Sequence, residues 1–179
     1  GDEAQAEQAF QAAITADAKD STGYQALAEF YLRSGRAQEA EAVLRKGLEQ
    51  AGERPAILLL LAASLESSAQ FDKAIELYED LYRRDPKSGV VANNLASLLS
   101  DHRRDEASLQ RAFDIAQRFR NSNMPQFKDT LGWIMLLRGE KDKAGALLKA
   151  AADDLPNRAA VQFAMGLACQ PIGQRGRTA

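Results

Sequence analysis

The chain carries a pattern that recurs about every 34 residues, and this repeat constrains its fold more than any other feature. A large apolar residue followed directly by alanine or glycine recurs along the chain. The pairs begin at positions 27, 61, 95, 131 and 165, so the spacing is 34 residues except for one interval of 36. Each unit therefore has room for two short helices and the turns beside them.

Apolar residues recur at helical spacing on two successive stretches of each unit, with a turn between them. In the first complete unit they are Tyr24, Leu27, Ala28, Tyr31, Ala40, Leu44 and Gly47. Gly35 and Gly139 stand where a helix would end in the left-handed conformation. Pro55 and Pro125 stand where the next unit begins, since a first helical turn does not need that amide donor. The pattern predicts one pair of helices per unit.

The period and this placement of small and apolar residues resemble the tetratricopeptide repeat. The resemblance implies an all-α fold, a right-handed superhelical α-solenoid of antiparallel helix pairs. In such an array each unit packs on its neighbours, and the first helix of each pair lines the concave side. The resemblance also implies a surface that binds another protein or a peptide.

The repeat divides the chain into one half-unit, four units and a second half-unit. We expect the second helix of a truncated preceding repeat over residues 1–20, repeats over 21–54, 55–88, 89–124 (with a longer turn) and 125–158, and a terminal half-repeat helix with a disordered tail over 159–179. The N-terminal half-unit would leave an open apolar face of Ala6, Phe10, Ala13 and Ile14. The alternative is that residues 4–18 form an atypical cap.

The resemblance assigns the groove by position within each first helix, counting from Ser21, Pro55, Gly89 and Pro125. Leu59 and Leu60 fall on groove positions, and a side-by-side leucine pair left in water indicates a partner surface. The alternative is that the two leucines fill the groove of a tightly wound array.

Trp133 and Asp129 fall on the same face of the fourth first helix, and tryptophan is enriched among binding hot spots. The alternative is a core tryptophan. Asn93 and Asn94 could hold the backbone of an extended peptide through their amides, or they could form a solvated polar face. The predicted partner-binding residues are Leu59, Leu60, Asn93, Asn94, Asp129 and Trp133.

Composition excludes several classes of function. The net charge of −2 offers no basic field for nucleic acid, and no apolar run approaches the length of a membrane span. The single histidine, His102, lies in a charged turn and has no nucleophile beside it in sequence, so we expect no catalytic site. One cysteine and one histidine cannot form a structural zinc site, and no glycine-rich phosphate loop is present. We expect no cofactor and no metal.

Two more specific resemblances bear on the partner. Repeat arrays that grip acidic chaperone C-termini use lysine, arginine and asparagine in the groove, whereas the corresponding residues here are Gln25, Glu29, Leu60, Val90 and Asn94. Residues 93–96 and 129–133 are similar to late repeats of bacterial proteins of exopolysaccharide export and envelope sorting. That resemblance implies a periplasmic or outer-membrane-associated scaffold, and a cytoplasmic location stays open.

Two other functions remain compatible with the sequence. The array could regulate an enzyme whose catalytic domain lies elsewhere in a longer protein. It could also self-associate through the open N-terminal helix, in which case its role would be structural.

Overall fold

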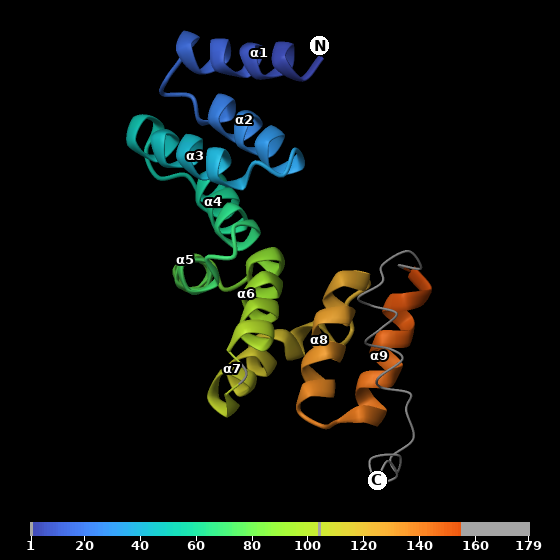
Figure 1. The fold of residues 1–179 in the computed structure, drawn as a ribbon. Helices are drawn as coiled ribbons and strands as arrows, with labels where there is room; N and C mark the ends of the chain where they lie inside the picture. The colour runs from blue at the N-terminus through green and yellow to red at the C-terminus, as the bar shows by residue number, and fades with distance from the viewer. Residues whose placement is uncertain (1, 104, 155–179) are drawn as a thin grey trace, which may run out of the picture. The chain divides into compact units, whose positions relative to one another are not determined.

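The structure is a computed structural model that describes residues 2–103 and 105–154, and the secondary structure of this part of the chain is helical throughout (Figure 1). The elements are α1 (Asp2–Ala16), α2 (Ser21–Arg33), α3 (Ala37–Ala51), α4 (Pro55–Ser67), α5 (Phe71–Arg84), α6 (Gly89–His102), α7 (Glu106–Ala116), the 3₁₀ turn η1 (Gln117–Phe119), α8 (Pro125–Leu137) and α9 (Lys141–Asp154). The helices pack as sequential antiparallel pairs, as expected for a tetratricopeptide array. The predicted half-repeat helix over 159–179 lies outside the described residues.

Helix ends follow the local signals in the sequence. The Asp20 carboxylate accepts a hydrogen bond from the Thr22 amide at 3.0 Å, and the Asp105 carboxylate accepts one from the Ser108 amide at 2.9 Å. These caps start α2 and α7 by satisfying amides that have no partner within the helix. Pro55 and Pro125 open α4 and α8.

The turn between the two helices of a pair has one geometry in three repeats. Gly35 and Gly139 have positive φ angles of 72° and 83°, as the sequence predicts, and Ala69 takes the same conformation with φ 57°. In each case the next amide reaches back to a carbonyl five residues earlier, for example Arg36 to Tyr31 at 2.8 Å and Gln70 to Leu65 at 2.8 Å. This closure reverses the chain and sets the second helix beside the first.

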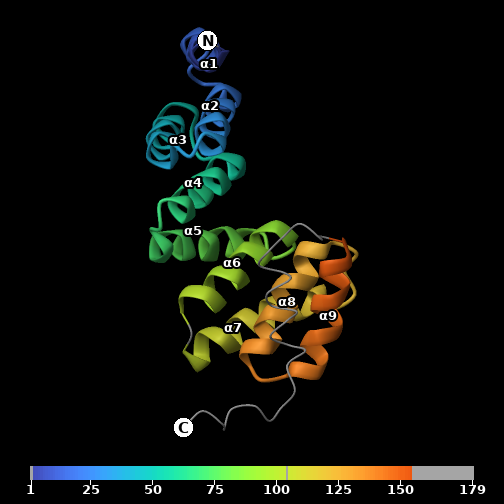
Figure 2. The ribbon, with the colours of Figure 1, turned by 45° about the vertical axis from the view of Figure 1, so that its right-hand side comes forward.

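The chain forms two compact units, residues 1–91 and 92–179. In the first unit α2 packs against α1, α3 and α4, and α4 packs against α3 and α5 (Figures 1 and 2). The core side chains Tyr24, Leu44, Ile57 and Tyr78 are fully buried. The Tyr24 side chain of α2 packs directly on Gly47 of α3, where a Cβ atom would lie 2.9 Å from Cγ of Tyr24.

In the second unit, the described part of which covers residues 92–103 and 105–154, α8 packs against α7, η1 and α9. Leu131, Ile134, Met135 and Leu148 form a fully buried core. Phe119 is buried in the 3₁₀ turn after α7, where its ring centre lies 4.4 Å from that of Phe127.

Helix α1 contacts the rest of the first unit through α2. None of its described side chains is fully buried, and Phe10 packs on Phe30 with ring centres 6.0 Å apart. The Glu7 carboxylate accepts hydrogen bonds from Arg36 and from the Tyr31 hydroxyl, both at 2.8 Å. The hydrogen bond from Arg36, and to a smaller extent the one from Tyr31, holds the pKa of Glu7 below its ordinary value. Of the predicted open face, Ala13 is exposed, whereas Ala6, Phe10 and Ile14 are half-buried, so most of that face is already covered by α2.

Candidate functional site

The candidate site is the set of first-helix side chains at the positions that the sequence assigns to the groove, which we name the first-helix face. In the first unit it lies on α2 and α4, which pack on each other. Leu58 and Leu61 are 6% and 5% exposed, whereas Leu59 and Leu60 between them are half-buried. Leu58 and Leu61, at the two ends of the leucine run, therefore pack in the core, whereas Leu59 and Leu60 between them keep part of their surface in solvent.

Asn93 and Asn94 lie side by side in sequence on α6, and both are half-buried. The Oδ1 atom of Asn93 is sealed from solvent and accepts no hydrogen bond within the described part of the chain. A buried acceptor without a partner carries a desolvation cost of about 1–3 kcal/mol. An extended peptide could reach this atom only if neighbouring side chains moved aside.

Trp133 on α8 is half-buried, unlike Ile134 and Met135 beside it, which are fully buried. Its indole Nε1 donates a hydrogen bond to Oδ1 of Asp101 at 2.8 Å. This bond joins two first helices, α6 and α8, and holds the tryptophan ring in one orientation. Asp129, one turn before Trp133 on the same helix, is also half-buried.

Asp101 is the residue of this site that sequence reasoning missed. Its charged neighbours in the sequence favour a turn, whereas in the structure Asp101 lies exposed in the last turn of α6 and also accepts a contact from the Ser97 hydroxyl at 3.4 Å. The available signal is its register. Asp101 occupies the thirteenth position of the third unit, which is a groove position of the repeat.

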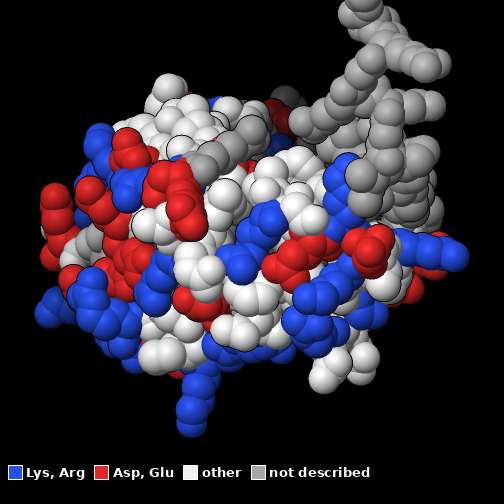
Figure 3. Space-filling model, turned by 90° about the horizontal axis from the view of Figure 1, so that it is seen from below, with Lys and Arg blue, Asp and Glu red and all other residues white. Residues whose placement is uncertain are grey.

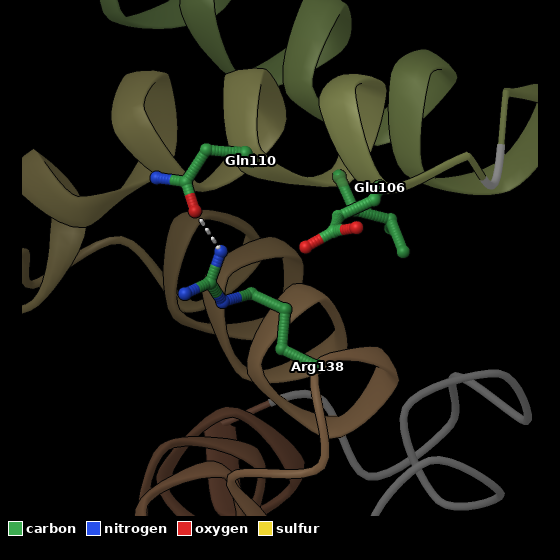
Figure 4. Close-up of a pocket in the computed structure, with 4 residues that line it drawn as sticks. Glu106, Gln110 and Arg138 are labelled. Carbon is green, nitrogen blue, oxygen red and sulfur yellow. Dashed lines mark hydrogen bonds between the residues drawn. The ribbon is translucent and has the colours of Figure 1, made fainter.

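A hollow of about 360 Å³ lies beside α7 and is lined by Glu106, Leu109, Gln110 and Arg138 (Figure 4). Arg138 donates to Oε1 of Gln110 at 2.6 Å and to Glu140 at 3.2 Å, and its guanidinium stands 4.2 Å from the centre of the Phe113 ring. The hydrogen bond from Lys143, and to a smaller extent the one from Arg138, holds the pKa of Glu140 below its ordinary value. The Arg138 guanidinium is thus already engaged by side chains of the protein, including Gln110 of α7.

A second hollow, of about 310 Å³, lies between α1, α2 and α3 in the first unit. Tyr24 and Leu27 belong to its lining, and they occupy the face of α2 opposite to Gln25 and Glu29. The Tyr24 hydroxyl is buried without a hydrogen-bond partner in the described structure, but it is sealed from solvent and so unavailable to a ligand entering the hollow.

Surface charge shows no single sign on the side drawn in Figure 3, where lysine and arginine alternate with aspartate and glutamate over short distances. Among the described residues, no three His, Cys, Asp or Glu side chains gather closely enough to hold a metal ion. No described helix has the length and apolar character needed to span a bilayer.

Two family models of the tetratricopeptide repeat match the sequence, one over residues 1–64 and the other over residues 55–98. The chain is a tetratricopeptide-repeat protein. Such repeats are typical of non-catalytic modules that bind other proteins. A comparison with curated protein sequences finds no match.

Solved structures of bacterial repeat proteins share the fold of this tetratricopeptide-repeat protein. YrrB, a repeat protein described as having an unusual peptide-binding site, aligns with a TM-score of 0.69 at 19% identity, over 91% of this chain and 83% of its own. A tetratricopeptide-repeat protein from Parabacteroides merdae aligns with a TM-score of 0.70 at 18% identity, over 93% of this chain and 68% of its own. PilF of Pseudomonas aeruginosa aligns with a TM-score of 0.66 at 22% identity, over 83% of this chain and 67% of its own.

Proposed function

We propose that this protein is a scaffold that binds an extended segment of a partner protein on its first-helix face. The observation that carries the proposal is the state of Trp133. This large aromatic side chain is half-buried, and its indole N–H donates a hydrogen bond to Asp101. Binding hot spots are enriched in tryptophan, and a ring already held in place loses little conformational entropy when a partner arrives.

The leucine pair supports the same proposal in the first unit. Leu59 and Leu60 retain exposed apolar surface, although Leu58 and Leu61 already supply the core contacts of α4. A partner that covers this apolar surface would gain about 25 cal/mol of binding free energy for each Å² buried. Peptide binding is also what the description of YrrB reports for a protein of this fold.

Affinity capture tests the proposal. The wild-type chain is compared with a double variant, Leu60→Asp with Trp133→Ala, and the matched control is Glu49→Ala with Lys149→Ala, two exposed side chains of second helices. Circular dichroism confirms that each bait is folded. We expect a protein that both the wild type and the control retain and the double variant loses. If all three baits retain the same set, the first-helix face does not bind, and the proposal fails.

We further propose that the partner belongs to a bacterial envelope assembly connected with exopolysaccharide secretion, and that the protein is periplasmic or associated with the outer membrane. The support is the resemblance of residues 93–96 and 129–133 to late repeats of such proteins. Capture from envelope and cytosolic extracts in parallel tests it. A partner that is enriched only from cytosol contradicts the envelope assignment and leaves the scaffold role intact.

Self-association through α1 is a second candidate function, favoured by the absence of any fully buried side chain among the described residues of this helix. Phe10 is a poor residue for the test, because its ring packs on Phe30 and a substitution would also loosen α1. Ala13→Glu changes the exposed face alone. A concentration-dependent sedimentation coefficient that Ala13→Glu abolishes supports self-association, and a concentration-independent monomer excludes it.

A further inference from the structure

We propose that the first-helix face recognises a basic segment, with an arginine or lysine side chain of the partner seated on the Trp133 ring beside the Asp101 carboxylate. This inference rests on the proposed scaffold function and names the chemistry of its partner.

The charged side chains of the first-helix face are mainly acidic in both units. In the first unit the face carries Glu29 and Glu66 against one cation, Arg33, which pairs with Glu29 at 3.5 Å. In the second unit the groove positions of α6 and α8 carry Asp101 and Asp129, with neither lysine nor arginine. An acidic binding face attracts a basic segment and opposes an acidic one.

The Trp133–Asp101 pair has the geometry to hold a cation. A carboxylate that accepts the indole N–H at 2.8 Å lies at the edge of the ring and draws the indole proton toward it. This polarisation leaves more negative charge on the ring face, and a cation within about 6 Å of the ring centre is attracted to that face. Among the described residues, Asp101 accepts hydrogen bonds from Trp133 and Ser97, and the arginines that stand over aromatic rings do so at Tyr31, Phe113 and Phe119.

The protein fills two comparable sites with its own arginines. Arg36 stands 4.3 Å from the centre of the Tyr31 ring and bonds the carboxylates of Glu7 and Glu39. Arg138 stands 4.2 Å from the centre of the Phe113 ring and bonds Glu140. Trp133 with Asp101 provides the aromatic ring and the carboxylate of such a site. Within the described chain the cation is the one component that a partner would have to supply.

Other side chains fit this position less well. An apolar side chain laid over Trp133 would exclude water from the Asp101 carboxylate, and burying an ionised group without a counter-charge is costly. An acidic side chain would meet a like charge. An arginine or lysine satisfies both the ring face and the carboxylate.

Fluorescence gives a direct test, because Trp133 is the single tryptophan of the chain. The protein is titrated with an acetylated and amidated peptide of alternating leucine and arginine, and with versions that carry citrulline or glutamate in place of arginine. Citrulline keeps the shape of arginine but not its charge. We expect a saturable change in Trp133 emission with the arginine peptide, at least fivefold weaker binding of the citrulline peptide, and no response to the glutamate peptide.

Asp101→Asn separates the charge from the hydrogen bond, because the asparagine oxygen can still accept the indole N–H. We expect this variant to lose at least fivefold in affinity for the arginine peptide while its affinity for the citrulline peptide is unchanged. Asp153→Asn, an exposed acid on the second helix α9, serves as the matched control and should bind like the wild type.

The outcomes separate this inference from the function on which it rests. Equal binding of the arginine and citrulline peptides, or no saturable response up to about 1 mM, overturns the cation site. If the affinity capture still finds a partner that depends on Leu60 and Trp133, the scaffold function survives that result. If the capture finds none but the arginine peptide binds with the expected dependence on Asp101, the cation site stands and the wider groove assignment fails.

Discussion

At the scale of single residues, the fold depends on a few positions where backbone conformation or exposure departs from the average. Ala69 takes the left-handed conformation that Gly35 and Gly139 take in the equivalent turns. The surrounding hydrogen bonds impose this conformation on a residue that has a Cβ atom. Trp133 is the second such position, half-buried among core neighbours.

We expect Ala69→Gly to stabilise the protein. The left-handed conformation costs an L residue about 1–2 kcal/mol, and the greater freedom of glycine in the unfolded chain offsets about 0.4–1 kcal/mol of the relief. The net gain should be about 0.5–1 kcal/mol in the free energy of unfolding, measured by urea denaturation. Gly35→Ala is the reverse substitution and should destabilise. A loss of stability in Ala69→Gly would show that the turn carries no strain.

Trp133→Ala should weaken partner binding more than it weakens the fold. A fully buried aromatic residue costs about 3–5 kcal/mol of stability when it is truncated, and the half-buried Trp133 should cost clearly less. A hot-spot residue should cost about 2 kcal/mol or more of binding free energy. Denaturation and titration of the captured partner measure the two. A stability loss in the full core range would mean that Trp133 acts as a core residue.

At the scale of elements, side-chain hydrogen bonds that recur with the repeat join each helix pair to the next. Glu41 accepts a hydrogen bond from Gln70 at 2.9 Å, as Glu7 does from Arg36, and both partners shift by 34 positions between the two ties. Close backbone approach is the other device. At Gly132 a Cβ atom would lie 2.8 Å from Cγ of Leu148, so α8 and α9 touch along a glycine.

Gly132→Ala should destabilise the α8–α9 pair. The added methyl group would force the buried Leu148 side chain or the helices apart, and overpacking of this kind costs about 1–3 kcal/mol. Gly145→Ala on α9 is the matched control, since a Cβ atom there meets nothing within 4 Å. That control should gain about 0.5–1 kcal/mol from its higher helix propensity. Equal effects of the two substitutions would contradict the close approach.

Glu7→Gln should loosen α1 without unfolding the rest of the first unit. The substitution removes the negative charge that pairs with Arg36, and it leaves only one side-chain oxygen to accept from Arg36 and the Tyr31 hydroxyl. We expect faster amide hydrogen exchange confined to α1. Because the folded pKa of Glu7 is lowered, the tie is complete above the ordinary glutamate pKa and is lost as the pH falls through the folded value. Unchanged exchange in α1 would show that apolar contacts alone hold the helix.

At the scale of the whole molecule, an array in which each pair packs only on its neighbours distributes stability over separate local interfaces. Ala69 belongs to the first compact unit and Gly132 to the second. Substitutions at positions that share no partners act independently.

The effects of Ala69→Gly and Gly132→Ala should therefore add in the double variant. We expect the change in unfolding free energy to equal the sum of the single changes within about 0.5 kcal/mol. Urea denaturation followed by circular dichroism measures it. A larger departure would demonstrate energetic coupling between the two units.

The sequence by itself determined the helix pairs, their turns and the core positions, because these depend on local chemistry and on periodicity. Pro55, Gly35 and Gly139 act within a few residues of their own position, and Leu58 and Leu61 follow from helical spacing. The left-handed Ala69 could not be predicted from residue type, because only its surroundings impose that conformation.

Only the tertiary structure decided which of the predicted groove residues are accessible and how they are held. Leu59 and Leu60 keep exposed surface, whereas the Oδ1 atom of Asn93 is sealed without a partner. The bond from Trp133 to Asp101 spans 32 residues of sequence and joins side chains of two different helices, α6 and α8. Exposure and long-range hydrogen bonds depend on packing between distant segments, and no local pattern encodes that packing.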